Sequence, residues 1–99
     1  MAYNLIVKED ADQDIAVAYL YYEERLEGLG DRFLRELQNR YNQLKENPKH
    51  YGFISVNDPK SLRKVVVNHF PYLVVYQIID EHVIIHAIHN SSRENTKFL

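Results

Sequence analysis

The 99-residue sequence contains no cysteine and no long apolar run. Without cysteine it forms neither a disulfide nor a thiolate metal site, and this favours a reducing compartment. No apolar stretch approaches the ~20 residues of a membrane-spanning helix, and the first residues lack the basic start and apolar core of a signal peptide. We therefore expect a cytoplasmic protein with no membrane partner, folded as one domain over residues 1–99.

The sequence also lacks the short motifs that mark common enzyme classes. It has no glycine-rich phosphate loop, no HExxH, no GxSxG and no cysteine nucleophile, so we expect no cofactor. Two histidines, His86 and His89, lie three residues apart in a strand-like run. Residues at this spacing point to opposite faces of a strand, which disfavours a shared metal site.

Charge is distributed unevenly along the chain. Residues 1–31 carry two basic and eight acidic side chains, whereas residues 32–99 carry ten basic and six acidic ones. A chain that wraps nucleic acid usually has a stronger basic excess, so RNA or DNA is disfavoured as the main partner. Carboxylates of the first half, among them Asp12, Asp14, Glu23 and Glu24, are interpreted as a solvated helix face.

The second half of the chain predicts a three-stranded meander. Runs rich in β-branched and aromatic residues cover 62–67, 72–79 and 82–89, with turn-forming residues between them. The middle run is apolar on both faces, so we expect it to be covered on both. We also expect apolar groups of this sheet to stay exposed until a partner or a second copy of the chain covers them.

The first half predicts a strand followed by a helix. Residues 2–8 alternate as a short strand that joins the later sheet. Asp10 resembles an N-cap, with Gln13 in capping-box position, and opens a helix that runs to about Glu27. The glycines of residues 28–30 end this helix.

A second helix follows at once. Asp31 is its predicted cap, apolar residues recur at helical spacing from Phe33 to Leu44, and Asn47 and Pro48 stop it. Two helices joined by so short a loop form an antiparallel hairpin. The predicted order is β-α-α-β-β-β, an α+β two-layer domain with the helical hairpin packed on a mostly antiparallel sheet.

Basic side chains beside the meander are the first candidates for a functional site. Arg63 and Lys64 begin one strand, and Arg93 follows the last. If the meander folds back on itself, these ends approach one another and form a small cationic patch suited to phosphate or carboxylate. The alternative, which we weight equally, is a set of solvated strand ends that blunt the sheet edge.

Two further side chains belong to the candidate site. His89 ends the last strand, where an imidazole with a near-neutral pKa could act as general acid or base. A hydrogen bond to a nearby carbonyl is the commoner role of such a histidine. Tyr72 shares a strand face with Tyr76, and tyrosines at this spacing are more often core than a stacking surface for bases.

Together these segments resemble the RelE/ParE superfamily of toxins from bacterial type II toxin–antitoxin systems. The resemblance covers A-x-x-D-I-x-x-A-x-x-Y-Y at 11–22, G-L-G-D-R-F-L-x-E-L at 28–37, E-N-P at 46–48, L-R-K-V at 62–65, F-P-Y at 70–72 and A-I-H-x-x-x-R at 87–93. It implies a βααβββ fold, a cognate antitoxin encoded beside the toxin, and growth arrest by the free toxin.

Members of the superfamily divide between ribosome-dependent mRNA endonucleases and inhibitors of DNA gyrase. For the nuclease branch, the resemblance implies that His89 and Arg93 are catalytic; substrate or target binding is assigned to Arg63, Lys64, Tyr72 and Arg93. The acidic total charge and sparse C-terminal cations instead favour the ParE-like branch, a binding protein without chemistry of its own. The RelE-like nuclease stays open as an alternative, as does a non-toxic chain that only binds its antitoxin.

Overall fold

The computed structural model describes residues 2–55 and 57–92. The elements are β1 (Asn4–Val7), α1 (Glu9–Arg25), α2 (Leu29–Glu46), the short 3-10 helix η1 (Pro48–His50), β2 (Arg63–Val66), β3 (Tyr72–Ile79) and β4 (His82–Asn90). The predicted α+β class and the order of helices and strands are confirmed. None of the helices in the described part has the length and apolar character needed to cross a membrane.

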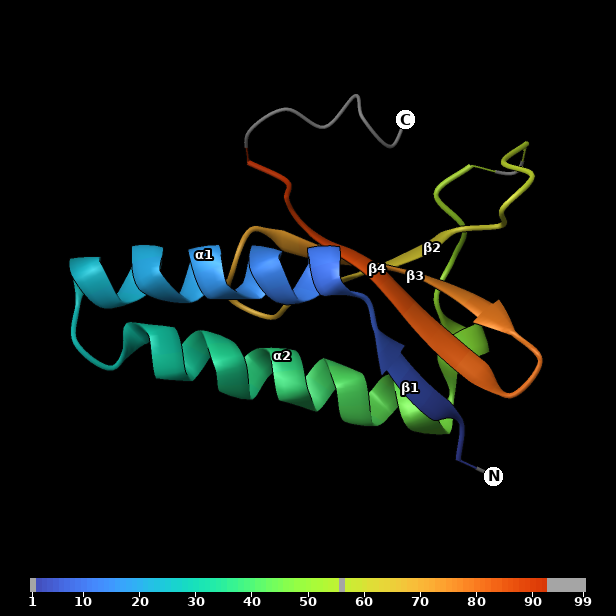
Figure 1. Cartoon of the computed structure of the whole chain (residues 1–99), viewed down its shortest axis with the longest axis horizontal. Coiled ribbons are helices and arrows are strands. Elements are labelled where there is room, and N and C mark those ends of the chain that lie inside the picture. Colours follow the sequence, from blue (N-terminus) through green and yellow to red (C-terminus); the bar gives the residue numbers. More distant parts are fainter. Residues whose placement is uncertain (1, 56, 93–99) are drawn as a thin grey trace.

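The four strands form one sheet in the order β1-β4-β3-β2. Strands β2, β3 and β4 pair antiparallel as the predicted meander, and β1 joins the far side of β4 in parallel. Figure 1 shows β1 crossing beside β4 before the chain enters α1. The start of α1 is thereby placed next to the part of β4 that β1 no longer covers.

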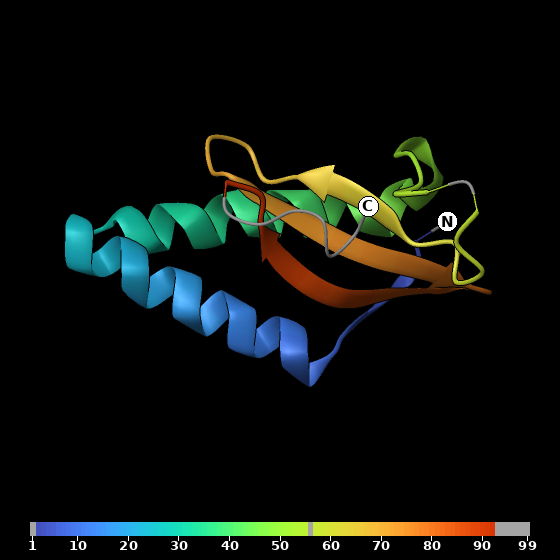
Figure 2. The ribbon, with the colours of Figure 1, turned by 90° about the horizontal axis from the view of Figure 1, so that it is seen from above.

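The helices form an antiparallel hairpin that packs on one face of the sheet, and its closed end projects beyond the strands in both views (Figures 1 and 2). Most residues of the predicted apolar stripes are buried: Ala11, Ala18 and Tyr22 on α1, and Phe33, Leu37, Tyr41 and Leu44 on α2. Ile15 of the first stripe is half-buried, and Leu34 of the second is 38% exposed. Four rings pack edge to face or tilted where the hairpin meets the sheet: Tyr22, Phe33, Phe70 and Tyr72.

The predicted cap of the first helix is wrong. Helix α1 begins at Glu9, its N-cap residue is Lys8, and no side chain caps it. The Lys8 N–H donates to the Ile85 carbonyl over 3.0 Å, which holds the chain extended up to the first helical residue. This strand contact, rather than a capping box at Asp10, sets where the helix starts.

The second cap is also displaced from its predicted position. Helix α2 starts at Leu29, and its N-cap is Gly28, with φ of 89° in the left-handed region that glycine adopts without strain. Asp31 lies in the first turn instead. A Cβ on Gly30 would lie 2.8 Å from the Tyr19 carbonyl oxygen, so the two helices approach closely only because this position has no side chain.

The sheet face opposite the helices is only partly covered. Side chains of β3 alternate, and on this second face Val75 is buried, Leu73 is half-buried and Ile79 is exposed. The expectation that β3 is covered on both faces therefore holds for part of the strand. Apolar side chains do remain exposed on this sheet face: Ile6 at 44%, Ile79 at 47% and Val66 at 51%.

Candidate functional site

The last strand contains a β-bulge that changes where its histidines point. Val75 pairs with Ala87 and Tyr76 pairs with Ile85, so His86 is an extra residue in β4. His86 hydrogen-bonds the side chain of Gln77, and His89 pairs with Leu73. Gln77 and Leu73 are four residues apart in β3, so their side chains point to the same face, the one away from the helices. Both histidines therefore lie on that face. The prediction of opposite faces is wrong because a bulge shifts the period of the strand by one residue.

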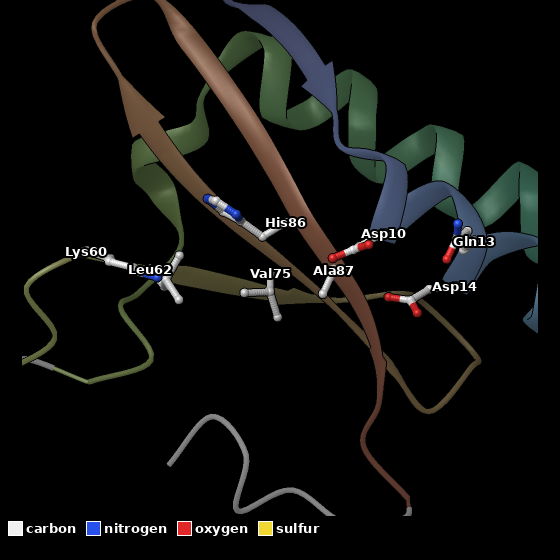
Figure 3. A pocket seen from close by; sticks show the side chains of 8 residues that line it. All are labelled: Asp10, Gln13, Asp14, Lys60, Leu62, Val75, His86 and Ala87. Carbon is white, nitrogen blue, oxygen red and sulfur yellow. The ribbon is translucent and has the colours of Figure 1, made fainter.

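A shallow pocket of about 390 Å³ lies beside this bulge (Figure 3). The start of α1, the connector before β2 and strands β3 and β4 all contribute to it. Its lining residues are Asp10, Gln13, Asp14, Lys60, Leu62, Val75, His86 and Ala87. Carboxylates from α1 form one wall and Lys60 comes from the connector, while Val75 and Ala87 lie between them in the close-up.

Hydrogen bonds fix the proton on the His86 ring. Gln77 donates its amide N–H to the Lys60 carbonyl over 2.9 Å, so its side-chain oxygen is the acceptor for His86 Nε2 at 3.0 Å. Burial, followed by the nearby charges of Lys8 and Lys60, lowers the pKa of His86. The ring is therefore neutral near pH 7, with the proton on Nε2. The described lining residues include no hydroxyl or thiol for such a base to activate.

The side chain of Arg63 is held within the protein. Its Nη1 donates to the carbonyls of Tyr51 at 2.5 Å and Lys49 at 3.3 Å, and its guanidinium lies 4.0 Å above the ring of Phe53. Arg63 also shares the helix-facing side of β2 with the buried Val65. These contacts tie the connector to the sheet, and they engage Nη1 and one face of the guanidinium.

The other predicted residues do not gather around Arg63. Lys64 is exposed and, as the next residue in the strand, points to the opposite face. Arg63 pairs with Tyr76, whereas His89 lies opposite Leu73, which pairs with Val66. Val66 lies three positions along the strand from Arg63, roughly 10 Å at the rise of a strand.

The two remaining candidate residues are Arg93 and Tyr72. Arg93 lies outside the described residues. Tyr72 is buried within the aromatic cluster, and its hydroxyl accepts a hydrogen bond from Asn90 Nδ2 at 3.5 Å. The structure thus places Tyr72 in the core, the role that tyrosines at this spacing usually have. Within the described residues no three histidine or carboxylate side chains gather as a metal site.

Two carboxylates that were interpreted as part of a solvated helix face accept hydrogen bonds from the backbone. Asp14 accepts the Ile88 N–H at 3.0 Å, and Glu23 accepts the Gly30 N–H at 2.8 Å. Both are half-buried, so they do not belong to a purely solvated face. Position on the helix gave a partial signal for Asp14 alone, because it lies near the edge of the buried stripe. Their partners depend on the tertiary fold and have no local signature.

Comparison with known proteins agrees with this architecture. The family described as "ParE toxin of type II toxin-antitoxin system, parDE" matches residues 5–95. Among solved structures, a chain from "Chromosomal ParDE TA system from P. aeruginosa" superposes with a TM-score of 0.77 at 14% identity, covering 90% of this chain and 96% of that one. No curated protein matches the sequence significantly.

The fold and the family match define a toxin of the RelE/ParE superfamily, on the ParE-like side. The chain belongs to the ParE toxin family of type II toxin–antitoxin systems, because the family match spans nearly its whole length. The structural neighbour shares too little sequence to add more than the fold.

Proposed function

We propose that this ParE-family toxin arrests growth by binding a protein target, DNA gyrase, in the bacterial cytoplasm, without cleaving RNA. The observation that carries the proposal is the engagement of Arg63. Its guanidinium is bound to two backbone carbonyls and stacked on Phe53, which leaves it poorly placed to hold a phosphate. A ribonuclease built on this sheet would need that group free at the surface.

The separation of the remaining candidates supports the same proposal. General acid–base catalysis requires the base within hydrogen-bond reach of the attacking group, with cations around the phosphate. Arg63 lies on the helix-facing side of β2, whereas His89 and Lys64 lie on the opposite face of the sheet, so Arg63 and the candidate base do not converge. The net charge of −2 also opposes strong binding to a ribosome, whose affinity for proteins depends on neutralised phosphates.

We also propose that a cognate antitoxin neutralises the toxin by covering the exposed sheet face. Ile6, Val66 and Ile79 expose large apolar area there, on three different strands. An extended or helical segment of a disordered partner would remove this area from water as it folds on the toxin. A second copy of the chain would cover the same surface equally well, so the oligomeric state of the free toxin must be measured too.

The experiment is induction of this chain alone in growing cells, with plasmid supercoiling and messenger RNA integrity followed in the same culture over the first minutes. Loss of negative supercoiling or DNA breakage with intact messages is the expected result. Cleaved messages with normal supercoiling would instead identify a RelE-like nuclease. Unimpaired growth together with tight antitoxin binding would identify a chain that has lost toxicity.

A further inference from the structure

The two helices of the hairpin carry opposite charge. Residues 32–50, which cover most of α2 and all of η1, have five basic and two acidic side chains, whereas α1 has one basic and six acidic ones. The net charge of −2 for the whole chain hides this difference. A surface of one sign on part of a molecule attracts partners of the opposite sign to that part.

The solvent side of α2 is a stripe of arginine and amide side chains. Its members are all exposed and recur at helical spacing: Arg32, Arg35, Asn39, Asn42 and Gln43. The stripe lies opposite the buried one from Phe33 to Leu44, so it points away from the core. In Figure 1 this helix forms the lower border of the molecule. We call the stripe, with Gln38 at its edge and Lys49 of η1, the α2 outer face.

The arginines of this face differ from their neighbour Arg40 in how they are used. Arg40 donates to the Val66 carbonyl at 2.6 Å and to Asn68 Oδ1 at 2.9 Å, which ties α2 to the end of β2. Among the described residues, Arg32 and Arg35 have no hydrogen bond or ion pair. Their guanidinium groups are therefore available to a ligand.

Arginine and amide side chains together suit the edges of base pairs. In the major groove of DNA, arginine pairs with guanine, and asparagine or glutamine pairs with adenine. This groove is wide enough to admit an α-helix, and the 18 residues of α2 span roughly 27 Å. The major groove of duplex RNA is too deep and narrow for side chains to read. A membrane surface requires apolar side chains, which the stripe lacks.

We propose that the α2 outer face docks in the major groove of duplex DNA, as a second binding surface beside that for the protein target. Arg35, Asn39 and Asn42 lie near the middle of α2, where they would meet base edges. Arg32 and Lys49 lie toward its two ends, where they would meet phosphates. The proposal goes beyond the proposed function and does not depend on gyrase being the target.

The acidic groups nearby set the strength of this contact. Glu36 and Glu46 flank the stripe, and α1 is acidic on the other side of the hairpin. We therefore expect weak binding that depends strongly on salt. With about three phosphates neutralised, the affinity should fall roughly fortyfold between about 50 and 200 mM salt.

The test is a fluorescence anisotropy titration of labelled duplex DNA with the full-length chain. A duplex of about 16 base pairs is roughly twice as long as α2. Duplex RNA of the same length and sequence is the matched probe. We expect DNA to bind with a Kd of about 1–100 µM at low salt and RNA to bind at least about tenfold more weakly. NMR shifts of the isotope-labelled chain should map to α2 and η1.

Variants of exposed residues assign the binding to this face. Arg35→Gln should weaken DNA binding about tenfold, and Asn39→Ala should weaken it severalfold. Arg25→Gln on α1 changes the net charge equally and should leave the affinity unchanged. Asn57→Ala, an exposed amide of the connector, is the control for Asn39→Ala. Circular dichroism checks that each variant is folded.

Several results would overturn the proposal. They are no binding of the DNA duplex at about 100 µM chain and low salt, equal affinity for duplex RNA, or an Arg35→Gln variant that binds like the parent. Shifts that map to the outer sheet face around Lys64 would also do so. If Arg35→Gln fails to fold, the shifts of the parent decide. None of these measurements uses gyrase or toxicity, so their outcome is separate from that of the proposed function.

Discussion

The carboxylate of Asp14 accepts the backbone N–H of Ile88 over 3.0 Å, across 74 residues of sequence. This hydrogen bond lies just past the point where β1 stops pairing with β4 at Ile85. The strand beyond that point has lost its neighbour, and the Asp14 side chain of α1 takes its place as acceptor. The bond therefore fixes the start of the hairpin on the edge of the sheet.

Replacing Asp14 by alanine should lower the free energy of unfolding by about 1–3 kcal/mol, because the half-buried Ile88 amide loses its acceptor. Glu24→Ala, on the exposed part of the same helix, is the matched control and should change stability by less than about 0.5 kcal/mol. Urea denaturation of both variants measures the difference. Equal stability of the two variants would show that water replaces the carboxylate at no cost.

The absence of a side chain at Gly30 lets the two helices approach closely, so Gly30→Ala should push them apart. A Cβ there would lie 2.8 Å from the Tyr19 carbonyl oxygen, which is backbone and cannot rotate away. We expect a loss of about 1–3 kcal/mol, typical of overpacking. Gly52→Ala is the control, since a Cβ at that position meets nothing within 4 Å. Thermal unfolding of the two variants should differ clearly, and similar midpoints would contradict the prediction.

Much of this fold could be predicted from local pattern. The stripe from Phe33 to Leu44 was located by its periodicity, because a helix repeat reflects which face is buried. The runs of β3 and β4 were located by their richness in β-branched and aromatic residues and by the turn formers between them. The N-caps were not located correctly. Lys8 is positioned by a hydrogen bond to Ile85, a residue far along the chain, and such a tertiary contact overrides the local preference of Asp10.

The candidate site was less predictable than the fold. A bulge at His86 has no sequence signature, yet it moves His86 and His89 onto one face. The hydrogen bonding of Arg63 depends on where the connector places the carbonyl of Tyr51, and the periodicity of the sequence does not determine that position. The sequence shows that a strand carries a basic residue, but it does not show which group that residue contacts.

The buried hydroxyl of Tyr76 donates to the Pro48 carbonyl at 2.6 Å and joins the start of η1 to the middle of the sheet. Tyr76→Phe keeps the ring and removes only this bond, so we expect a loss of about 1–2 kcal/mol. Tyr21→Phe alters an exposed ring and should cost less than about 0.5 kcal/mol. Chemical denaturation compares the two. A Tyr76→Phe variant as stable as the parent would mean that the Pro48 carbonyl finds another donor.

The same tyrosine should make the protein sensitive to alkali. Burial raises the pKa of Tyr76 to about 12, from about 10 in the unfolded chain. Between these values the unfolded chain has released a proton that the folded chain keeps, so the free energy of unfolding falls as pH rises. The stability that Tyr76 confers is complete below about pH 10 and is lost toward pH 12. Urea unfolding over this range should therefore show the gap between the parent and Tyr76→Phe narrowing with pH, and a constant gap would contradict the assignment.

Adjacent residues Arg63 and Lys64 provide the sharpest test of how this sheet is used. Arg63→Ala should lower the free energy of unfolding by about 1–3 kcal/mol, because the carbonyls of Tyr51 and Lys49 lose their charged donor and Phe53 its stacked guanidinium. Lys64→Ala, one residue on but exposed on the other face, should stay within about 0.5 kcal/mol of the parent. Supercoiling and message integrity in induced cells complete the comparison at matched levels of folded protein. If instead both variants fold normally and both abolish cleavage of messages, the two cations bind RNA and the proposal of a gyrase-binding toxin is wrong.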